Sequence, residues 1–158
     1  MHSLYGQPDR VAAIMAGAMV ETVLERLLVA SFKQRSKERE ASMLGQGGSL
    51  STFAAKIQIA ASFGIISEPM ATELGRLKDI RNVFAHAPTN VTFETAEIAE
   101  LSHNFGMLVA VRAVPSMQKS PFIDKYTGRR GYVLVATILS IMMDQYIKKL
   151  GGTPVYSS

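Results

Sequence analysis

Arg81, Asn82 and His86 are the residues of this sequence whose types and spacing could do chemistry. They lie close to a predicted helix end, because Pro88 disfavours helical geometry for Ala87 before it. An imidazole at the C-terminal end of a helix is placed to act as an acid or to contact an anion. We therefore take Arg81, Asn82 and His86 as the candidate catalytic residues.

Helical geometry divides these three side chains between two faces. Each residue of a helix turns the chain by ~100°, so Asn82 and His86 stack one turn apart, and Asp79 joins them three residues before Asn82. Arg81 and His86 lie ~140° and ~7.5 Å apart on the same helix. We call Asp79, Asn82 and His86 the polar stripe and expect it to face water or a partner.

Arg81 is predicted on the flank of the apolar side of this helix. Its neighbours three and four places away include no acidic residue, so its charge needs a partner on another element. Glu21 and Glu25 are candidates, since they stand one turn apart in a mostly apolar helix. In the structural alternative, Asn82 and His86 bond the last carbonyls of the helix and Arg81 bridges to another helix.

Five helices are predicted to position these residues. The first covers about 9–32, the second begins at a cap on Ser49 or Ser51 and ends at Gly64, and the third covers 67–86. The fourth runs from about Thr95 through Phe105, with a possible extension to Val111, and the last covers about 129–150. We expect one all-α domain over residues 1–158, an up-and-down bundle or close variant with a short tail at 151–158.

The connections are predicted from charge, glycine and proline. Residues 33–40 are mostly charged and run into Gly45–Gly48, which indicates a frayed helix end and then a flexible loop. Val91–Phe93 should form a brief extended link, and Pro115 and Pro121 should bracket a loop.

Composition excludes several classes of site. The chain has no cysteine, which removes disulfides and thiolate metal sites and fits a reducing, cytoplasmic setting. No two of its three histidines have the spacing of a metal pair, so we expect neither a metal nor a cofactor. The apolar run at 11–20 continues into Glu21 and Glu25, so we interpret it as a helix and not as a signal peptide, and no membrane span is expected.

The net charge of +4 is concentrated in the last third of the chain. Residues 115–158 carry six Lys or Arg against two Asp or Glu, whereas 1–114 carry eleven of each sign. Arg129 and Arg130, with Lys125 and Tyr126, could touch RNA phosphates and stack a base. The alternative is a solvated loop.

Three stretches together resemble the bacterial mannitol operon repressor family. They are Ser49–Ile57, Phe63–Ser67 and Ile80–His86, in matching order and spacing, with Val91–Phe93 beyond them. The resemblance covers a core of about 9–112 and weakens after Pro115. It implies an all-helical transcriptional regulator within the wider HEPN-type helical domains, lacking a helix-turn-helix. The sequence likewise shows no such motif.

The resemblance implies two functions. One is a repressor-like regulator, expected as a homodimer, that acts through protein or RNA contacts and has no element for reading a DNA sequence. The other comes from the wider group, in which an Arg, a polar residue and a following His form the active site of metal-independent ribonucleases, often across a dimer. Arg81, Asn82 and His86 match that pattern, with His86 moving protons, Arg81 stabilising the phosphorane and Asn82 orienting the substrate.

Overall fold

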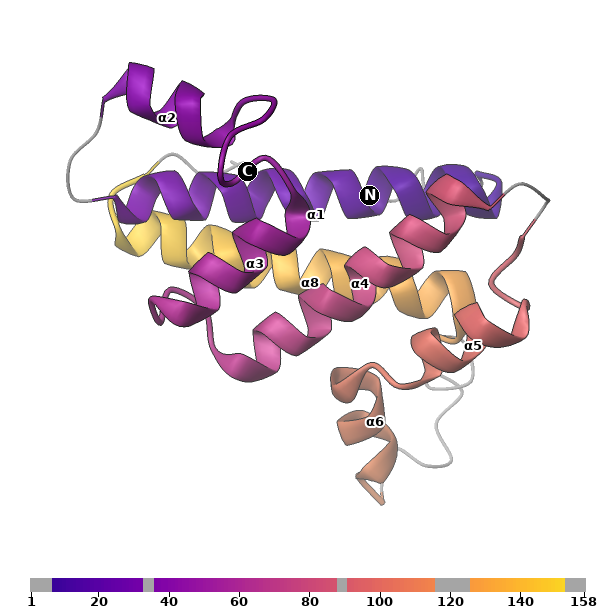
Figure 1. The fold of residues 1–158 in the computed structure, drawn as a ribbon. Coiled ribbons are helices and arrows are strands. Elements are labelled where there is room, and N and C mark those ends of the chain that lie inside the picture. Colours follow the sequence, from indigo (N-terminus) through magenta and orange to yellow (C-terminus); the bar gives the residue numbers. More distant parts are fainter. Residues whose placement is uncertain (1–6, 33–35, 88–90, 116–125, 153–158) are drawn as a thin grey trace. The chain divides into compact units, whose positions relative to one another are not determined.

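The computed structural model describes residues 7–32, 36–87, 91–115 and 126–152 (Figure 1). Seven helices occur in these ranges, and no strand does, which confirms the all-α prediction. The helices are α1 (Asp9–Ser31), α2 (Lys37–Leu44), α3 (Phe53–Ser62), α4 (Glu68–His86), α5 (Ala96–His103), α6 (Gly106–Ala113) and α8 (Gly128–Lys149).

The chain divides into two compact units. The first comprises residues 1–18 and 76–138, and the second comprises residues 19–75 and 139–158. Three helices contribute a segment to each unit: α1, α4 and α8. The candidate residues Arg81, Asn82 and His86 all belong to the first unit.

The first unit has an aromatic core. The ring of Phe93 lies 4.8 Å from that of Phe84 and 5.4 Å from that of Tyr132, measured between centroids. Phe105 lies 6.3 Å from Tyr132 on the same basis. All four side chains are buried, and tilted ring pairs of this kind stabilise a core beyond simple area burial. This core holds the last turns of α4 and the first turns of α8.

The second unit has an aliphatic core with one buried cation. Its buried side chains include Leu24, Leu27, Leu28, Leu50, Phe53, Leu74, Leu139 and Met143. Lys56 of α3 is also buried, and its Nζ lies 3.0 Å from Glu21 Oε1 and 2.7 Å from Glu25 Oε2. Burial by itself lowers the pKa of Lys56, but its hydrogen bonds and charge interactions with Glu25 and Glu21 outweigh this and raise it.

Helix α2 was not predicted, and the predicted cap of the next helix is wrong. Residues 37–44 form helix α2 where the sequence indicated a frayed end, because the hydroxyl of Ser36 caps the amide of Arg39. Helix α3 begins after Thr52, and neither Ser49 nor Ser51 is its cap: Thr52 Oγ1 accepts a hydrogen bond from the amide of Ala55 at 3.1 Å. The glycine stretch between these helices turns the chain back, so that the amide of Leu50 donates to the carbonyl of Met43.

The predicted fourth helix is two helices, α5 and α6. Asn104 ends α5, and Phe105 adopts a non-helical conformation with φ −58° and ψ 119° before α6 begins at Gly106. The fully buried Phe105 side chain packs near Tyr132, which accounts for the break. With α2, this split raises the predicted five helices to the seven described.

Other boundaries agree with the sequence. Helix α4 begins after Ser67, whose hydroxyl accepts from the amide of Met70, and it ends at His86. Gly64, after α3, has the expected left-handed φ of 65°. Within the described residues, no helix combines the length and apolarity needed to cross a bilayer. The predicted loop between Pro115 and Pro121, Lys125 and most of the tail lie outside the described residues.

Candidate functional site

The inner face of the last turns of α4 holds Arg81. An ideal Cβ placed on Gly17 of α1 would lie 2.7 Å from Arg81 Cγ and 3.2 Å from the hydroxyl of Tyr132. Only a residue without a side chain allows Arg81 to pass this close to α1. The aliphatic stem of Arg81 therefore packs against α1 at Gly17, where the hydroxyl of Tyr132 also lies.

Tyr132 joins three helices of the first unit at this point. Its hydroxyl lies 3.0 Å from the carbonyl of Ala13 on α1 and 3.4 Å from that of Leu77 on α4. Burial raises the pKa of Tyr132 strongly, and the nearby positive charge of Arg81 lowers it only in part. The hydroxyl thus stays protonated and acts as a donor that ties α8 to both helices.

The outer face of the same turns carries the polar stripe. Asp79 and His86 are exposed and Asn82 is half-buried. Asp79 forms an ion pair with Lys78, in which Oδ1 lies 2.9 Å from the lysine Nζ. The side chains of Asn82 and His86 make no hydrogen bond within the described part of the chain. The outward orientation expected for Asp79 and His86 is confirmed.

The end of α4 is capped by an arginine that the sequence analysis missed. Arg10 of α1 donates from Nη2 to the carbonyl of Ala87 at 2.8 Å. Within the described residues, Arg10 therefore has the carbonyl-capping role that the structural alternative gave to Asn82 and His86. Arg10 and Ala87 are 77 positions apart in the sequence, so no local pattern could reveal the contact. The guanidinium of Arg10 is thus bonded to the backbone of the residue that follows His86 in the sequence.

One chain does not bring all three candidate residues together. Helix α4 continues unbroken to His86, so the ~140° offset between Arg81 and His86 applies. Arg81 packs inward against Gly17, whereas His86 is exposed. Asn82 and His86 share the outer face with the capping guanidinium of Arg10 close by.

Comparison with protein families, curated proteins and solved structures finds no match to this chain. Among the described residues, no group of three or more His, Asp or Glu side chains could hold a metal ion.

The other sequence candidates are not part of the polar stripe. Glu21 and Glu25 contact Lys56 in the second unit, a partner that helical spacing did not reveal. Arg129 is bound to Asp9 through an Nη1–Oδ1 contact of 3.3 Å, and Arg130 is exposed at the start of α8. Tyr126 is half-buried, and Lys125 lies outside the described residues.

Proposed function

We propose that this protein is a regulatory binding protein of the mannitol operon repressor kind, which contacts its partner through the polar stripe of α4. The observation that supports this is the division of one short run between two faces. Arg81 serves the interior, while Asp79 and His86 are presented outward. Exposed polar side chains on a rigid, capped helix end form a surface suited to binding.

The order of the family-like stretches agrees with this proposal. Ser49–Ile57 includes the first half of α3, Phe63–Ser67 connects α3 to α4, and Ile80–His86 ends α4. The second stretch fixes the start of α4 through the Gly64 turn and the Ser67 cap, and the third carries Asn82 and His86 of the polar stripe. We place the protein in the cytoplasm, in keeping with its lack of cysteine.

We do not propose that the protein reads DNA through a helix-turn-helix. In the described residues, α5 and α6 are short and closely linked, as such a motif requires. However, α5 carries Glu97 and Glu100, and α6 carries Arg112 as its one charged residue. An acidic helix followed by an apolar one lacks the basic and polar side chains that contact phosphates and base edges. We propose instead a protein or RNA partner and a five-helix core to which α2 and α6 are additions.

A homodimer is part of the proposal. Val11, Ile14 and Met15 of α1 are 38%, 36% and 47% exposed and lie on one side of the helix. Three large apolar side chains at this spacing form a stripe that a second copy could cover. Light scattering after size exclusion would test this, with Ile14→Glu expected to shift a dimer to monomer while helicity stays unchanged. A monomeric parent protein would contradict it.

Site-specific photo-crosslinking tests the binding surface. A photoreactive residue at position 79 or 86 should form a discrete adduct in cells of the source organism, and one at Gln145 of α8, which is also exposed, should not. The adduct should disappear when the other two stripe residues are changed to alanine. Equal adducts from positions 86 and 145 would contradict the proposal.

The second candidate function is a metal-independent endoribonuclease using Arg81, Asn82 and His86. Arg10 gives it a specific argument, because its guanidinium is held at the carbonyl of Ala87, the residue after His86, where it could contact a phosphate that His86 protonates or deprotonates. Arg81 would join such a site through a second subunit. The test is cleavage of a mixed single-stranded RNA pool with chelator present. Cleavage that is lost in His86→Ala, Arg81→Ala and Arg10→Ala variants that remain folded would replace the regulator proposal with this one.

A further inference from the structure

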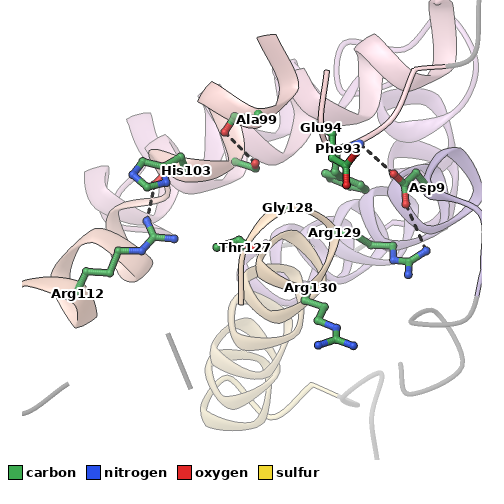
Figure 2. A pocket seen from close by; sticks show the side chains of 11 residues that line it. Asp9, Phe93, Glu94, Ala99, His103, Arg112, Thr127, Gly128, Arg129 and Arg130 are labelled. Atoms are coloured by element: carbon green, nitrogen blue, oxygen red, sulfur yellow. Dashed lines mark hydrogen bonds and ion pairs between the residues drawn. The ribbon is translucent and has the colours of Figure 1, made fainter. Parts of the chain in front are cut away.

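A pocket of about 680 Å³ opens beside the first turn of α8 in the first unit, apart from the polar stripe (Figure 2). Its charged and imidazole side chains are those of Asp9, Glu94, His103, Arg112, Arg129 and Arg130. The volume lies within the range of pockets that enclose small molecules. Figure 2 shows Arg112 and His103 on one side of the pocket and Arg129 and Asp9 on the other.

The charges of the lining favour an anion. Asp9 is already satisfied, because it contacts Arg129 at 3.3 Å and accepts from the amide of Phe93 at 2.9 Å. Arg112 bonds the carbonyl of His103 through Nη1 at 2.9 Å, and its other donors make no hydrogen bond within the described part of the chain. Arg130 makes no hydrogen bond or ion pair within the described residues. The pocket is also lined by the exposed carboxylate of Glu94, whose negative charge opposes the binding of an anion.

The first turn of α8 adds to this preference. Arg129 and Arg130 occupy it, and it contains no acidic residue. Positive side chains at the positive end of a helix are unfavourable, and an anion bound there would reverse the effect. The helix start is a contribution to the pocket and not the reason for it, since Arg112 comes from α6.

We propose that this pocket binds a small phosphate monoester. A phosphate monoester carries up to two negative charges and three terminal oxygens, so it suits a pocket that is lined by arginines from both α6 and α8. A carboxylate offers two oxygens in one plane. The hydroxyl of Thr127, which also lines the pocket and is exposed, supplies a further donor.

Single-stranded RNA fits this pocket less well. Proteins that bind single strands combine a basic groove with aromatic faces on which bases stack. The aromatic side chain in this lining, Phe93, is 4% exposed and is already packed against Phe84 and Tyr132. Among the described lining residues, a base could therefore stack only on the exposed imidazole of His103, while a compact phosphate ester needs no ring.

Isothermal titration of the full chain with glycerol 3-phosphate tests the proposal, with inorganic phosphate as a second ligand and glycerol as the uncharged control. Both phosphates should bind saturably and glycerol should not. Arg112→Gln and Arg130→Gln should each weaken binding about tenfold, as loss of a charged hydrogen bond does. Arg26→Gln, at an exposed position on α1, should leave it unchanged.

Glu94→Gln is the most discriminating variant. It removes a negative charge that repels phosphate, so it should tighten phosphate binding about threefold. Circular dichroism of each variant separates loss of binding from loss of fold. The proposal is overturned if glycerol 3-phosphate shows no saturable binding up to about 1 mM, or if Glu94→Gln weakens it. It is also overturned if a short RNA binds through Arg112 and Arg130 while glycerol 3-phosphate does not.

Discussion

The two faces of the last turns of α4 use the same short run in opposite ways. On the inner face, Arg81 packs against Gly17 and lies near the buried hydroxyl of Tyr132. On the outer face, His86 is exposed, and its side chain makes no hydrogen bond within the described residues. A pattern of residue types therefore does not define a site until the face on which each residue lies is known.

We expect the residues of the inner face to contribute to stability and those of the outer face to contribute to binding. Changes on the inner face should lower the free energy of unfolding, because they disturb a close contact between helices. Changes on the outer face should leave folding unaltered and affect only what the surface binds or cleaves. Measuring both properties in each variant would show whether the division is real.

The largest effect is expected at Gly17. Gly17→Val would place methyl groups where Arg81 Cγ and the Tyr132 hydroxyl already lie, and should lower the free energy of unfolding by about 2–3 kcal/mol. Gly75→Val is the matched control, since an added Cβ at this position in α4 meets nothing within 4 Å. That change should stay within about 0.5 kcal/mol. Urea denaturation measures both, and equal losses would contradict the close approach of Arg81 to α1.

Arg81 itself should rank second. Arg81→Ala removes an inward-packed aliphatic stem and should cost about 1–2 kcal/mol in the free energy of unfolding. Arg81→Met keeps most of the stem and should recover about half of that loss. Arg26→Ala, on the exposed side of α1, is the control and should change little. If Arg81→Ala were as neutral as Arg26→Ala, the inner role of Arg81 would be wrong.

Tyr132 should make the free energy of unfolding depend on pH under alkaline conditions. A tyrosine of the unfolded chain ionises near pH 10, whereas burial holds the pKa of Tyr132 well above this in the folded chain. The folded state keeps the proton longer, so its stability is constant below about pH 10 and falls as pH rises further. Lys56, whose pKa is also raised, contributes in the same direction above its ordinary value of 10.5.

Thermal unfolding from pH 8 to pH 11 would measure this dependence. Tyr132→Phe should cost about 1 kcal/mol at neutral pH through its lost hydrogen bonds, yet show a shallower fall in melting temperature above pH 10. Tyr146→Phe, at an exposed position on α8, should retain the full dependence of the parent. Identical slopes for Tyr132→Phe and the parent would show that this hydroxyl does not carry the effect.

The sequence predicted the features of α4 that arise locally. Ser67, Glu68 and Pro69 marked its start, Pro88 marked its end, and helical spacing assigned Arg81 and His86 to different faces. These signals lie within a few residues of the structure they determine. Helix α2 was missed because it buries no residue, so no apolar periodicity could reveal it.

The contacts that complete the site could not be predicted because they join distant parts of the chain. Arg10 caps the carbonyl of Ala87 from 77 residues away, and Gly17 lies more than 60 residues from Arg81. Lys56 is another such case, since it is buried only because Glu21 and Glu25 of an earlier helix balance its charge. A single sequence shows which residues need a partner but not which distant residue supplies it.

The smallest effect on stability is expected at His86, where the comparison is sharpest. His86→Ala should change the free energy of unfolding by about 0.5 kcal/mol or less, because the imidazole is exposed and Arg10 caps the helix in its place. The same variant should lose the crosslinked partner or, under the second function, RNA cleavage. A large loss of stability would place His86 in the fold with Arg81, and the two faces would then no longer differ in role. A stable variant with altered binding would instead show that one short run serves folding through Arg81 and recognition through His86.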